Sequence, residues 1–364
     1  MVIRFILYLC LLTASQISYA ELVIEVTQGK QSAIPIAVMP FSIGSDTVNV
    51  TDNIADIVSN DLASSGYFRL LDKQNIVKIP GSESEINYSD WRYLGQDFLV
   101  LGRVEQAASS QSYVVEFNVH DIHQKKSILK YRVKGKDGQL RDIAHYISDY
   151  IFKKLTGIEG VFSTKLIYVT TNKKRTRFNL NYADADGARE QLIFSSKEPI
   201  ISPAWSPDGK TVAYVSFESG QSEIYFQELA TGNRKLILNL PYTTSGPSFS
   251  PDGKKLAFVY TKLGNPDIYV LDLKSGQIEP LTSHYAIDTE PQWMSDNRHL
   301  VFTSSRSGTP QVYRLDSQTK EVKRITFEGN YNARPRLTQD NRKLVYVHKV
   351  ADSFHIASQD MASG

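Results

Sequence analysis

Cysteine is almost missing from this chain, because Cys10 is the only one among 364 residues. Cys10 lies in an N-terminal segment that we expect to be removed, so the mature chain would have no disulfide, no thiolate metal site and no cysteine nucleophile. The sequence also lacks a Gly-x-Ser-x-Gly elbow, a Gly-rich phosphate loop and a His-Glu-x-x-His motif. These absences argue against hydrolases, nucleotide-binding proteins and zinc proteases, and we expect neither catalysis nor a cofactor.

An excess of charge is missing too. The chain has 41 basic and 39 acidic residues, which give a formal net charge of +2. Loss of the N-terminal segment would remove one basic residue, Arg4, and would bring the net charge closer to zero. This balance argues against nucleic acid or an anionic membrane as the main partner.

The N-terminus has the pattern of a secretory signal peptide. Residues 1–20 combine one positive charge, an apolar run over residues 5–12 and small residues at Ser18 and Ala20. We therefore predict cleavage between Ala20 and Glu21 and a secreted protein. The run is too short to span a membrane. A lipoprotein site at Cys10 is disfavoured, because Leu precedes the cysteine and the leader before it would be very short.

One motif recurs at a constant period. Its copies begin with a proline, and successive prolines are 44 residues apart (247 − 203), at Pro203, Pro247, Pro291 and Pro335. In the first two copies Ser-Pro-Asp-Gly supplies a turn, and Asn297 and Asn341 replace the glycine in the others; asparagine tolerates positive φ best among the other residues. Alternating apolar strands surround each turn. This pattern predicts one four-stranded propeller blade per repeat.

The repeats at the two ends are incomplete. The first unit, from Leu166 to Ile193, has no Pro-x-aromatic strand, and the last unit ends at Gly364 after its third strand, which leaves 18 predicted strands. Closure as six four-stranded blades would need about 60 further residues, with a C-terminal strand completing the first blade. A five-bladed ring with one ragged blade is the alternative.

Residues 21–160 are predicted to form a separate α+β domain ahead of the propeller of residues 161–364. We expect a helix after Thr51 or Asp52 that ends at Gly66, and a last helix that ends at Gly157. The other expected elements are strands at 34–39, 67–71, 98–101, 113–119 and 128–133 and a short helix near 89–94. Residues 21–30 could be a strand of this domain or a segment that pairs with a partner.

Two further features have ordinary structural interpretations. His120 and His123 resemble a metal pair, but we expect them to be solvent-exposed residues of a hairpin. Asp184-Ala-Asp-Gly187 resembles a calcium loop, yet it lacks the later ligands and is better interpreted as a turn.

Function is therefore expected on surfaces. The loops that join consecutive blades gather at one mouth of a propeller channel. Here they carry Tyr242, Tyr285 and Tyr331 with the charges Glu290 and Arg334, a composition common at protein interfaces.

Several motifs outside the generic repeat resemble one family. They are residues 24–29 followed by 34–41, Asp90-Trp-Arg-x-Leu-Gly95, Ala144-His-x-Ile-Ser-Asp149, Lys154-Leu-Thr-Gly157 and Ser202-Pro-Ala-Trp-Ser-Pro-Asp-Gly209. In this order, after a cleavable signal, they resemble the TolB family of the Tol–Pal system of Gram-negative envelopes. The resemblance covers the chain from residue 21 onward. It implies an α/β domain followed by a six-bladed propeller.

The resemblance also implies partners and sites. It implies a periplasmic, non-enzymatic protein whose mature N-terminus contacts TolA, whose propeller mouth binds the lipoprotein Pal, and which supports outer-membrane integrity, constriction at division and the entry of some colicins. The Pal-facing residues would be Thr243, Gly246, Thr289, Glu290 and Tyr331. The TolA-facing residues would be Glu21, Leu22, Val23, Ile24, Glu25 and Val26.

Two alternatives from other classes stay open. A scaffold for outer-membrane protein assembly would share the propeller and differ only in its partners. A periplasmic hydrolase or lyase would need His or carboxylate clusters on the innermost strands, and residues 203–205, 247–249 and 291–293 offer none.

Overall fold

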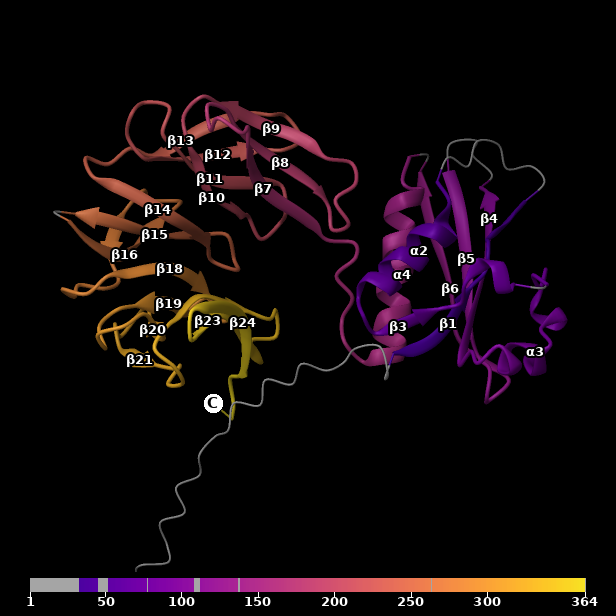
Figure 1. Ribbon diagram of the computed structural model, residues 1–364. Coiled ribbons are helices and arrows are strands. Elements are labelled where there is room, and N and C mark those ends of the chain that lie inside the picture. Colours follow the sequence, from indigo (N-terminus) through magenta and orange to yellow (C-terminus); the bar gives the residue numbers. More distant parts are fainter. Residues whose placement is uncertain are drawn as a thin grey trace, which may run out of the picture. The chain divides into compact units, whose positions relative to one another are not determined.

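The computed structural model describes residues 33–44, 52–76, 78–107, 112–136, 138–262 and 264–363. The described chain divides into two compact units (Figure 1). The N-terminal unit contains the described residues from 33 to 166 and, in addition, residues 181–191. The propeller unit contains residues 167–180 and the chain from residue 192 onward.

The N-terminal unit is built on a mixed sheet with the strand order β3-β1-β4-β5-β6, and β2 pairs with β4. The first strands run parallel, whereas β4, β5 and β6 form an antiparallel meander. The strands are β1 (Ile34–Val38), β2 (Ser42–Ile43), β3 (Phe68–Leu70), β4 (Phe98–Gln106), β5 (Ser112–Asp121) and β6 (Lys126–Lys136).

Helices cover the two faces of this sheet unequally. Helices α2 (Ile54–Ser64) and α4 (Leu140–Thr156) pack on one face, where their isoleucines and leucines meet the alternate side chains of β1, β4 and β5. On the other face a smaller core surrounds Trp91 of α3 (Tyr88–Tyr93), after the short turns η1 (Lys73–Asn75) and η2 (Glu83–Glu85). The α+β class and the expected elements of the described residues are confirmed, while residues 21–30 lie outside the described residues.

Two local expectations were wrong. The cap of α2 is Asn53, whose side chain accepts a hydrogen bond from the backbone N–H of Asp56. The second error concerns His120, because β5 continues to Asp121 and buries the imidazole completely. Nδ1 of His120 lies 3.2 Å from the Tyr88 hydroxyl, and burial lowers the pKa of the imidazole. Only His123 is an exposed hairpin residue, paired with Asp97.

In the described part of the chain the propeller has five blades. The first is β7-β8-β9, three four-stranded blades follow in chain order, and the last is β22-β23-β24. The 18 strands expected from the sequence are all present, and a sixth blade stays a prediction. Their bounds are β7 (Lys165–Thr171), β8 (Phe178–Asp184), β9 (Gln191–Ser196), β10 (Ile200–Trp205), β11 (Thr211–Ser216), β12 (Glu223–Glu228), β13 (Arg234–Leu238), β14 (Thr243–Phe249), β15 (Lys255–Lys262), β16 (Asn265–Asp272), β17 (Ile278–Pro280), β18 (Asp288–Trp293), β19 (His299–Ser304), β20 (Gln311–Asp316), β21 (Val322–Arg324), β22 (Asn332–Leu337), β23 (Lys343–Val350) and β24 (Ser353–Asp360).

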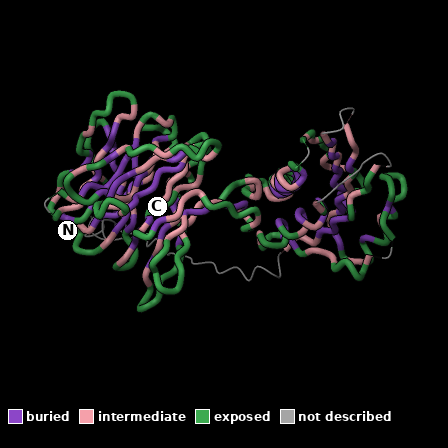
Figure 2. The backbone as a smooth tube through the Cα atoms, turned by 90° about the horizontal axis from the view of Figure 1, so that it is seen from above, coloured by how far each residue is buried: buried purple, intermediate pink, exposed green. Residues whose placement is uncertain are grey.

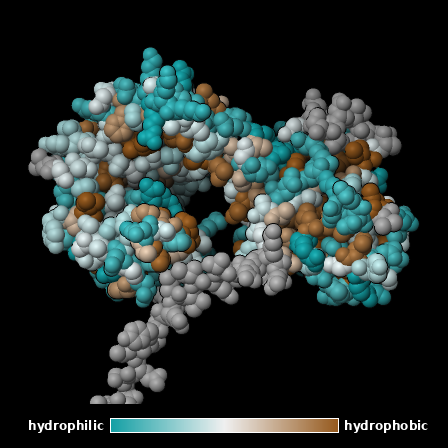
Figure 3. Space-filling model, viewed as in Figure 1, coloured by the Kyte–Doolittle hydropathy of each residue, from teal (hydrophilic) through white to brown (hydrophobic). Residues whose placement is uncertain are grey.

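The core of the propeller lies between blades. The second strands β11, β15 and β19 are buried almost throughout, on both faces (Figure 2). Phe258 packs with residues of the second and third blades, and Phe302 with residues of the third and fourth. Hydrophilic residues dominate the outward surface of the blades in Figure 3. A single blade would therefore expose two apolar faces, and stacking between neighbours stabilises the fold.

The turn asparagines make bonds that glycine cannot. Asn297 takes φ 57°, and its Oδ1 accepts a hydrogen bond of 2.8 Å from the N–H of Asp252 in the preceding blade. Asn341, at φ 56°, binds Ser295 of the preceding blade in the same way. Replacement of the turn glycine by asparagine thus adds a bond between blades.

We predict that Asn297→Gly lowers the free energy of unfolding by about 1 kcal/mol, although glycine takes positive φ without strain, because the bond to Asp252 is lost. Urea denaturation would measure the change. Ala351→Gly is the control, since Ala351 also has positive φ (51°) but its methyl side chain cannot form a hydrogen bond to another blade; it should be neutral or stabilising. An Asn297→Gly protein as stable as the parent would contradict the prediction.

Candidate functional site

The innermost strand of four blades carries the same bulge. Each strand shifts register just before its proline, and the residue there has positive φ. Proline cannot donate to the strand ladder, so pairing is interrupted at this point. The four bulge residues are Ser202 (φ 53°), Gly246 (φ 57°), Glu290 (φ 57°) and Arg334 (φ 56°), again 44 residues apart. Segments that were expected to be loops are therefore partly the beginnings of these strands.

Glu290 joins two blades at this bulge. Its carboxylate accepts hydrogen bonds from the backbone N–H of Arg334 (2.8 Å), from Nε of Arg334 (3.1 Å) and from the hydroxyl of Thr303 (2.9 Å). The Arg334 side chain is 74% exposed, against 29% for Glu290. Arg334 is therefore the more solvent-exposed member of this ion pair. The Glu290 carboxylate is held in place by its hydrogen bonds.

The other predicted Pal-facing residues lie on the same four inner strands or beside them. Thr243 is the exposed first residue of β14. Thr289 follows Asp288, which is fully buried and paired with Arg306 at 2.8 Å. A methyl group on Gly246 would lie 3.7 Å from Pro291 of the next blade. Tyr331 contacts Phe354 edge-on, at 5.4 Å between ring centres. The segment Glu21 to Val26 lies outside the described residues.

Exposed aromatic residues flank these bulges. Tyr285 is 86% exposed and lies against His284, and Ile287 and Tyr242 are also exposed. With Arg334, these side chains give the region around the bulges an aromatic and basic character, and among the described residues no group of acidic residues there is close enough to hold a metal. Such a surface is suited to binding a protein.

A second constellation lies inside the N-terminal unit. Asp184, at the end of β8, is 2% exposed, and its carboxylate accepts hydrogen bonds from Lys165 (2.5 Å), Arg189 (2.8 Å) and Arg141 (3.0 Å). Burial raises the pKa of Asp184, but the bonds from these three cations outweigh it and hold the pKa well below its usual range. The hydrogen bond to Asp142 raises the pKa of Arg189 in turn.

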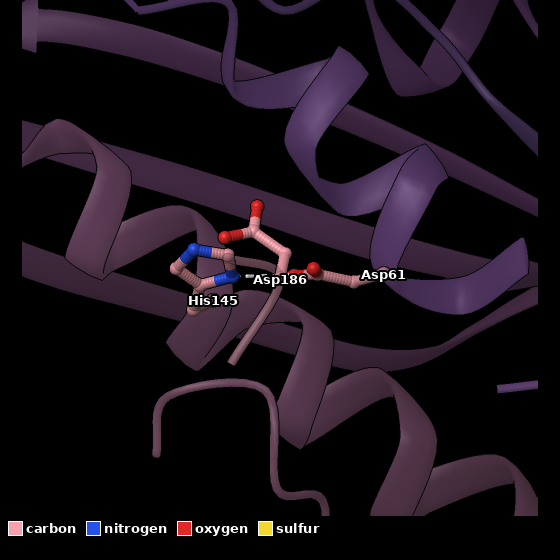
Figure 4. Close-up of side chains that lie close together, drawn as sticks. All are labelled: Asp61, His145 and Asp186. Carbon is pink, nitrogen blue, oxygen red and sulfur yellow. Dashed lines mark hydrogen bonds and ion pairs between the residues drawn. The ribbon is translucent and has the colours of Figure 1, made fainter. Parts of the chain in front are cut away.

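His145 of α4 adjoins this cluster and is 1% exposed. Its Nδ1 lies 2.8 Å from Asp61 of α2, which also accepts a bond from Ser148 at 2.7 Å (Figure 4). Nε2 of His145 lies 3.8 Å from Asp184 and has no hydrogen-bond partner among the described residues. The network thus ties α2, α4 and the turn 185–190 together.

Asp61, His145 and Asp186 are close enough to suggest a metal site, since one ligand atom from each lies within 4.8 Å of the others. The surrounding charges argue against it. Three carboxylates, those of Asp142, Asp184 and Asp186, already pair with the three cations Arg141, Lys165 and Arg189. The fourth, that of Asp61, bonds to His145 and Ser148. A divalent ion would leave a buried excess of positive charge, so we interpret the cluster as structural.

Sequence reasoning did not find this network. The turn at residues 184–187 is present as expected, but the buried role of Asp184 was missed. The sequence feature that could have indicated a buried polar network is in α4. There His145 and Ser148 lie among the buried apolar residues Ile143, Ile147 and Ile151. Polar residues on such a face require buried partners.

Comparison with known proteins now places the chain. A model of the TolB amino-terminal domain matches residues 22–128, and a model of the TolB β-propeller domain matches residues 152–364. The chain belongs to the TolB family. The Tol–Pal system protein TolB of Hahella chejuensis is 43% identical over 231 residues, which are 63% of this chain and 54% of that protein. The corresponding Marinomonas protein is 45% identical over 236 residues, covering 64% and 54%.

A solved structure agrees with this assignment. The crystal structure of TolB from Acinetobacter baumannii matches 91% of this chain and 81% of its own chain with a TM-score of 0.82 and 36% identity. The matches to the curated TolB relatives above span about half the length of those proteins. No helix in the described part of the chain is long and apolar enough to cross a membrane.

We predict that Asp184→Asn lowers the free energy of unfolding by about 3 kcal/mol at pH 7, because the buried carboxylate that Arg141, Lys165 and Arg189 share is lost. The folded pKa of Asp184 lies below the unfolded value of about 3.9, so its stabilisation is fully present above that value. The stabilisation decreases as the pH falls below the unfolded value, and it is gone once the pH has fallen through the folded pKa. Denaturation at pH 7 and pH 3 should therefore show a smaller difference between variant and parent at pH 3. A difference independent of pH would contradict this.

Proposed function

We propose that this protein is a periplasmic, non-enzymatic component of the Tol–Pal system that links TolA to the lipoprotein Pal. The observation that carries the proposal is the family match of both halves of the chain, together with a propeller surface that presents aromatic residues and an exposed arginine. Its contribution to the cell would be outer-membrane integrity and constriction at division, and colicins would use it as an entry route.

In this proposal the two parts of the chain bind different partners. Residues 21–26, ahead of the α+β domain of residues 21–160, would bind TolA by strand pairing, which their alternating apolar residues favour. The surface around the bulges of the propeller domain, residues 161–364, would bind Pal through Thr243, Gly246, Thr289, Glu290 and Tyr331. Signal cleavage before Glu21 would free the TolA-binding segment and deliver the chain to the periplasm.

The bonds of Glu290 refine its proposed role. Since the carboxylate already accepts three hydrogen bonds, its main contribution would be to hold Arg334 and the bulge of β22 in place for Pal. Thr289 and the exposed face of Arg334 would then make the direct contacts. Hydrogen bonds to a charged group of this kind contribute about 1.5–3 kcal/mol each when buried at an interface.

We predict that Glu290→Arg weakens binding of soluble Pal at least tenfold, because it places two cations together and releases the bulge. Calorimetry with the mature chain from residue 21 would measure the affinity. Glu279→Arg is the matched control, since it makes the same charge change at an exposed residue of β17, outside the bulges; its affinity should be unchanged.

The double variant Glu290→Arg, Arg334→Glu separates the two roles. Recovery of Pal binding would show that the internal pair matters, whereas continued loss in a folded protein would show that Pal contacts these side chains directly. Deletion of residues 21–30 should abolish binding of TolA and leave binding of Pal intact. A folded parent protein that does not bind Pal would overturn the proposal and favour the scaffold for outer-membrane protein assembly.

A further inference from the structure

Strand β6 forms an open edge of the N-terminal sheet. It is 11 residues long and, among the described residues, pairs with β5 alone. Edges of this length are usually shortened, covered or paired, because free backbone groups attract other strands. This edge therefore requires an explanation.

The register shows which backbone groups point outward. The N–H of Ala107 donates to the carbonyl of Ser112 at 2.8 Å, which fixes the alternation of hydrogen bonds along β4 and β5. Consequently the backbone N–H and C=O groups that point from β5 toward β6 belong to residues 113, 115, 117 and 119. Their partners in β6 are residues 135, 133, 131 and 129, respectively. The backbone groups of the alternate residues of β6 therefore point away from β5, toward the open edge. These residues are Lys130, Arg132, Lys134 and Lys136. Consistent with this, the N–H of Lys136 bonds to the Gln139 side chain.

The side chains along this edge differ between the two faces of the sheet. All four outward residues are cations, and their side chains lie on the face that α2 and α4 leave open. Glu116 pairs with Lys130 (3.5 Å) and Arg132 (2.9 Å). Lys134 and Lys136 have no acidic partner among the described residues. One face of the edge thus carries unbalanced positive charge.

The helix-covered face of the same edge is aromatic. Tyr131 of β6 stacks on Tyr150 of α4, with ring centres 4.6 Å apart, and Tyr146 lies one helical turn away. These rings remain 44%, 38% and 51% exposed, respectively. Gathered aromatic rings at a surface commonly mark a site of contact with another molecule.

We propose that β6 is a docking edge for an extended segment of another protein in which acidic residues alternate with apolar ones. Such a segment would continue the sheet by hydrogen bonds to Lys130, Arg132 and Lys134. Its acidic side chains would lie beside the cations on the open face. Its apolar side chains would lie on the other face, against Tyr131 and Tyr150. The inference does not depend on the Tol–Pal proposal, since it uses only the N-terminal unit.

A competing explanation is purely protective. Lysines on an edge strand discourage pairing between copies of the same chain. The two explanations differ in their response to an acidic strand, which a docking edge binds and a protected edge does not.

Fluorescence anisotropy with a labelled peptide of five Glu-Val repeats tests the docking edge on the full chain. We expect saturable binding that weakens at least tenfold in Lys134→Pro, because proline removes one outward N–H while the bonds of β6 to β5 remain. The double variant Lys130→Glu, Lys134→Glu should weaken binding equally. Lys173→Glu, Lys174→Glu is the matched control, with the same charge change at exposed residues of the propeller unit, and should bind normally.

Several results would overturn the proposal. They are no binding of the Glu-Val peptide, equal binding of a Glu-Pro repeat peptide, which cannot form a strand, and equal binding by all the variants. Binding of anionic lipid vesicles that is sensitive to the double variant and insensitive to Lys134→Pro would assign the edge to a membrane surface instead. Hydrogen exchange provides a second readout if Lys134→Pro does not fold, since the amides of Arg132 and Lys134 should exchange more slowly with peptide bound.

Discussion

Stacking of one blade on the next is the interaction on which the propeller depends. The three four-stranded blades bury apolar side chains on both faces, so none of them is stable by itself and each must present the same profile to its neighbours. Neighbouring blades can stack in the same way only if each blade has the same length of chain. The bulge before each proline therefore recurs at the same spacing in the sequence as the turn after each inner strand. Bonds between blades follow from this regularity. Glu290, Asn297 and Asn341 each reach an adjacent blade because the next bulge or turn always lies at the same place.

The N-terminal unit is held together on a different principle. Its apolar core supports the sheet and two helices, but a buried network of charges joins α2 to α4 and both to the turn after β8. Charged groups are costly to bury, and they are retained here in matched sets, with Asp184 facing three cations. Such a network specifies one arrangement of its members, since each displaced partner would leave a buried charge unpaired.

The two units also differ in what they offer to other molecules. The propeller presents side chains at the bulges of its inner strands. Positive φ at each bulge and bonds such as that from Arg334 to Glu290 fix the orientation of these side chains. The N-terminal sheet offers its backbone, because β6 has no second neighbour among the described residues. The propeller surface would recognise the shape and charge of a partner, whereas the β6 edge would recognise a partner segment in an extended conformation.

The sequence by itself determined the local and periodic features of this protein. Turns depend on residues at short offsets, so the 44-residue repeat, the 18 strands and the boundaries of most helices could be predicted from proline, glycine, asparagine and alternating apolar residues. Family motifs then indicated where partners would bind. Only the tertiary structure decided the rest. It buried His120, joined Asp61 to His145 across 84 positions, and engaged the Glu290 carboxylate through Arg334, 44 positions away. The repeat period places the bulges of Glu290 and Arg334 on neighbouring blades, but which groups bond there depends on how distant segments pack. The same holds for the burial of His120 and for the pair of Asp61 and His145.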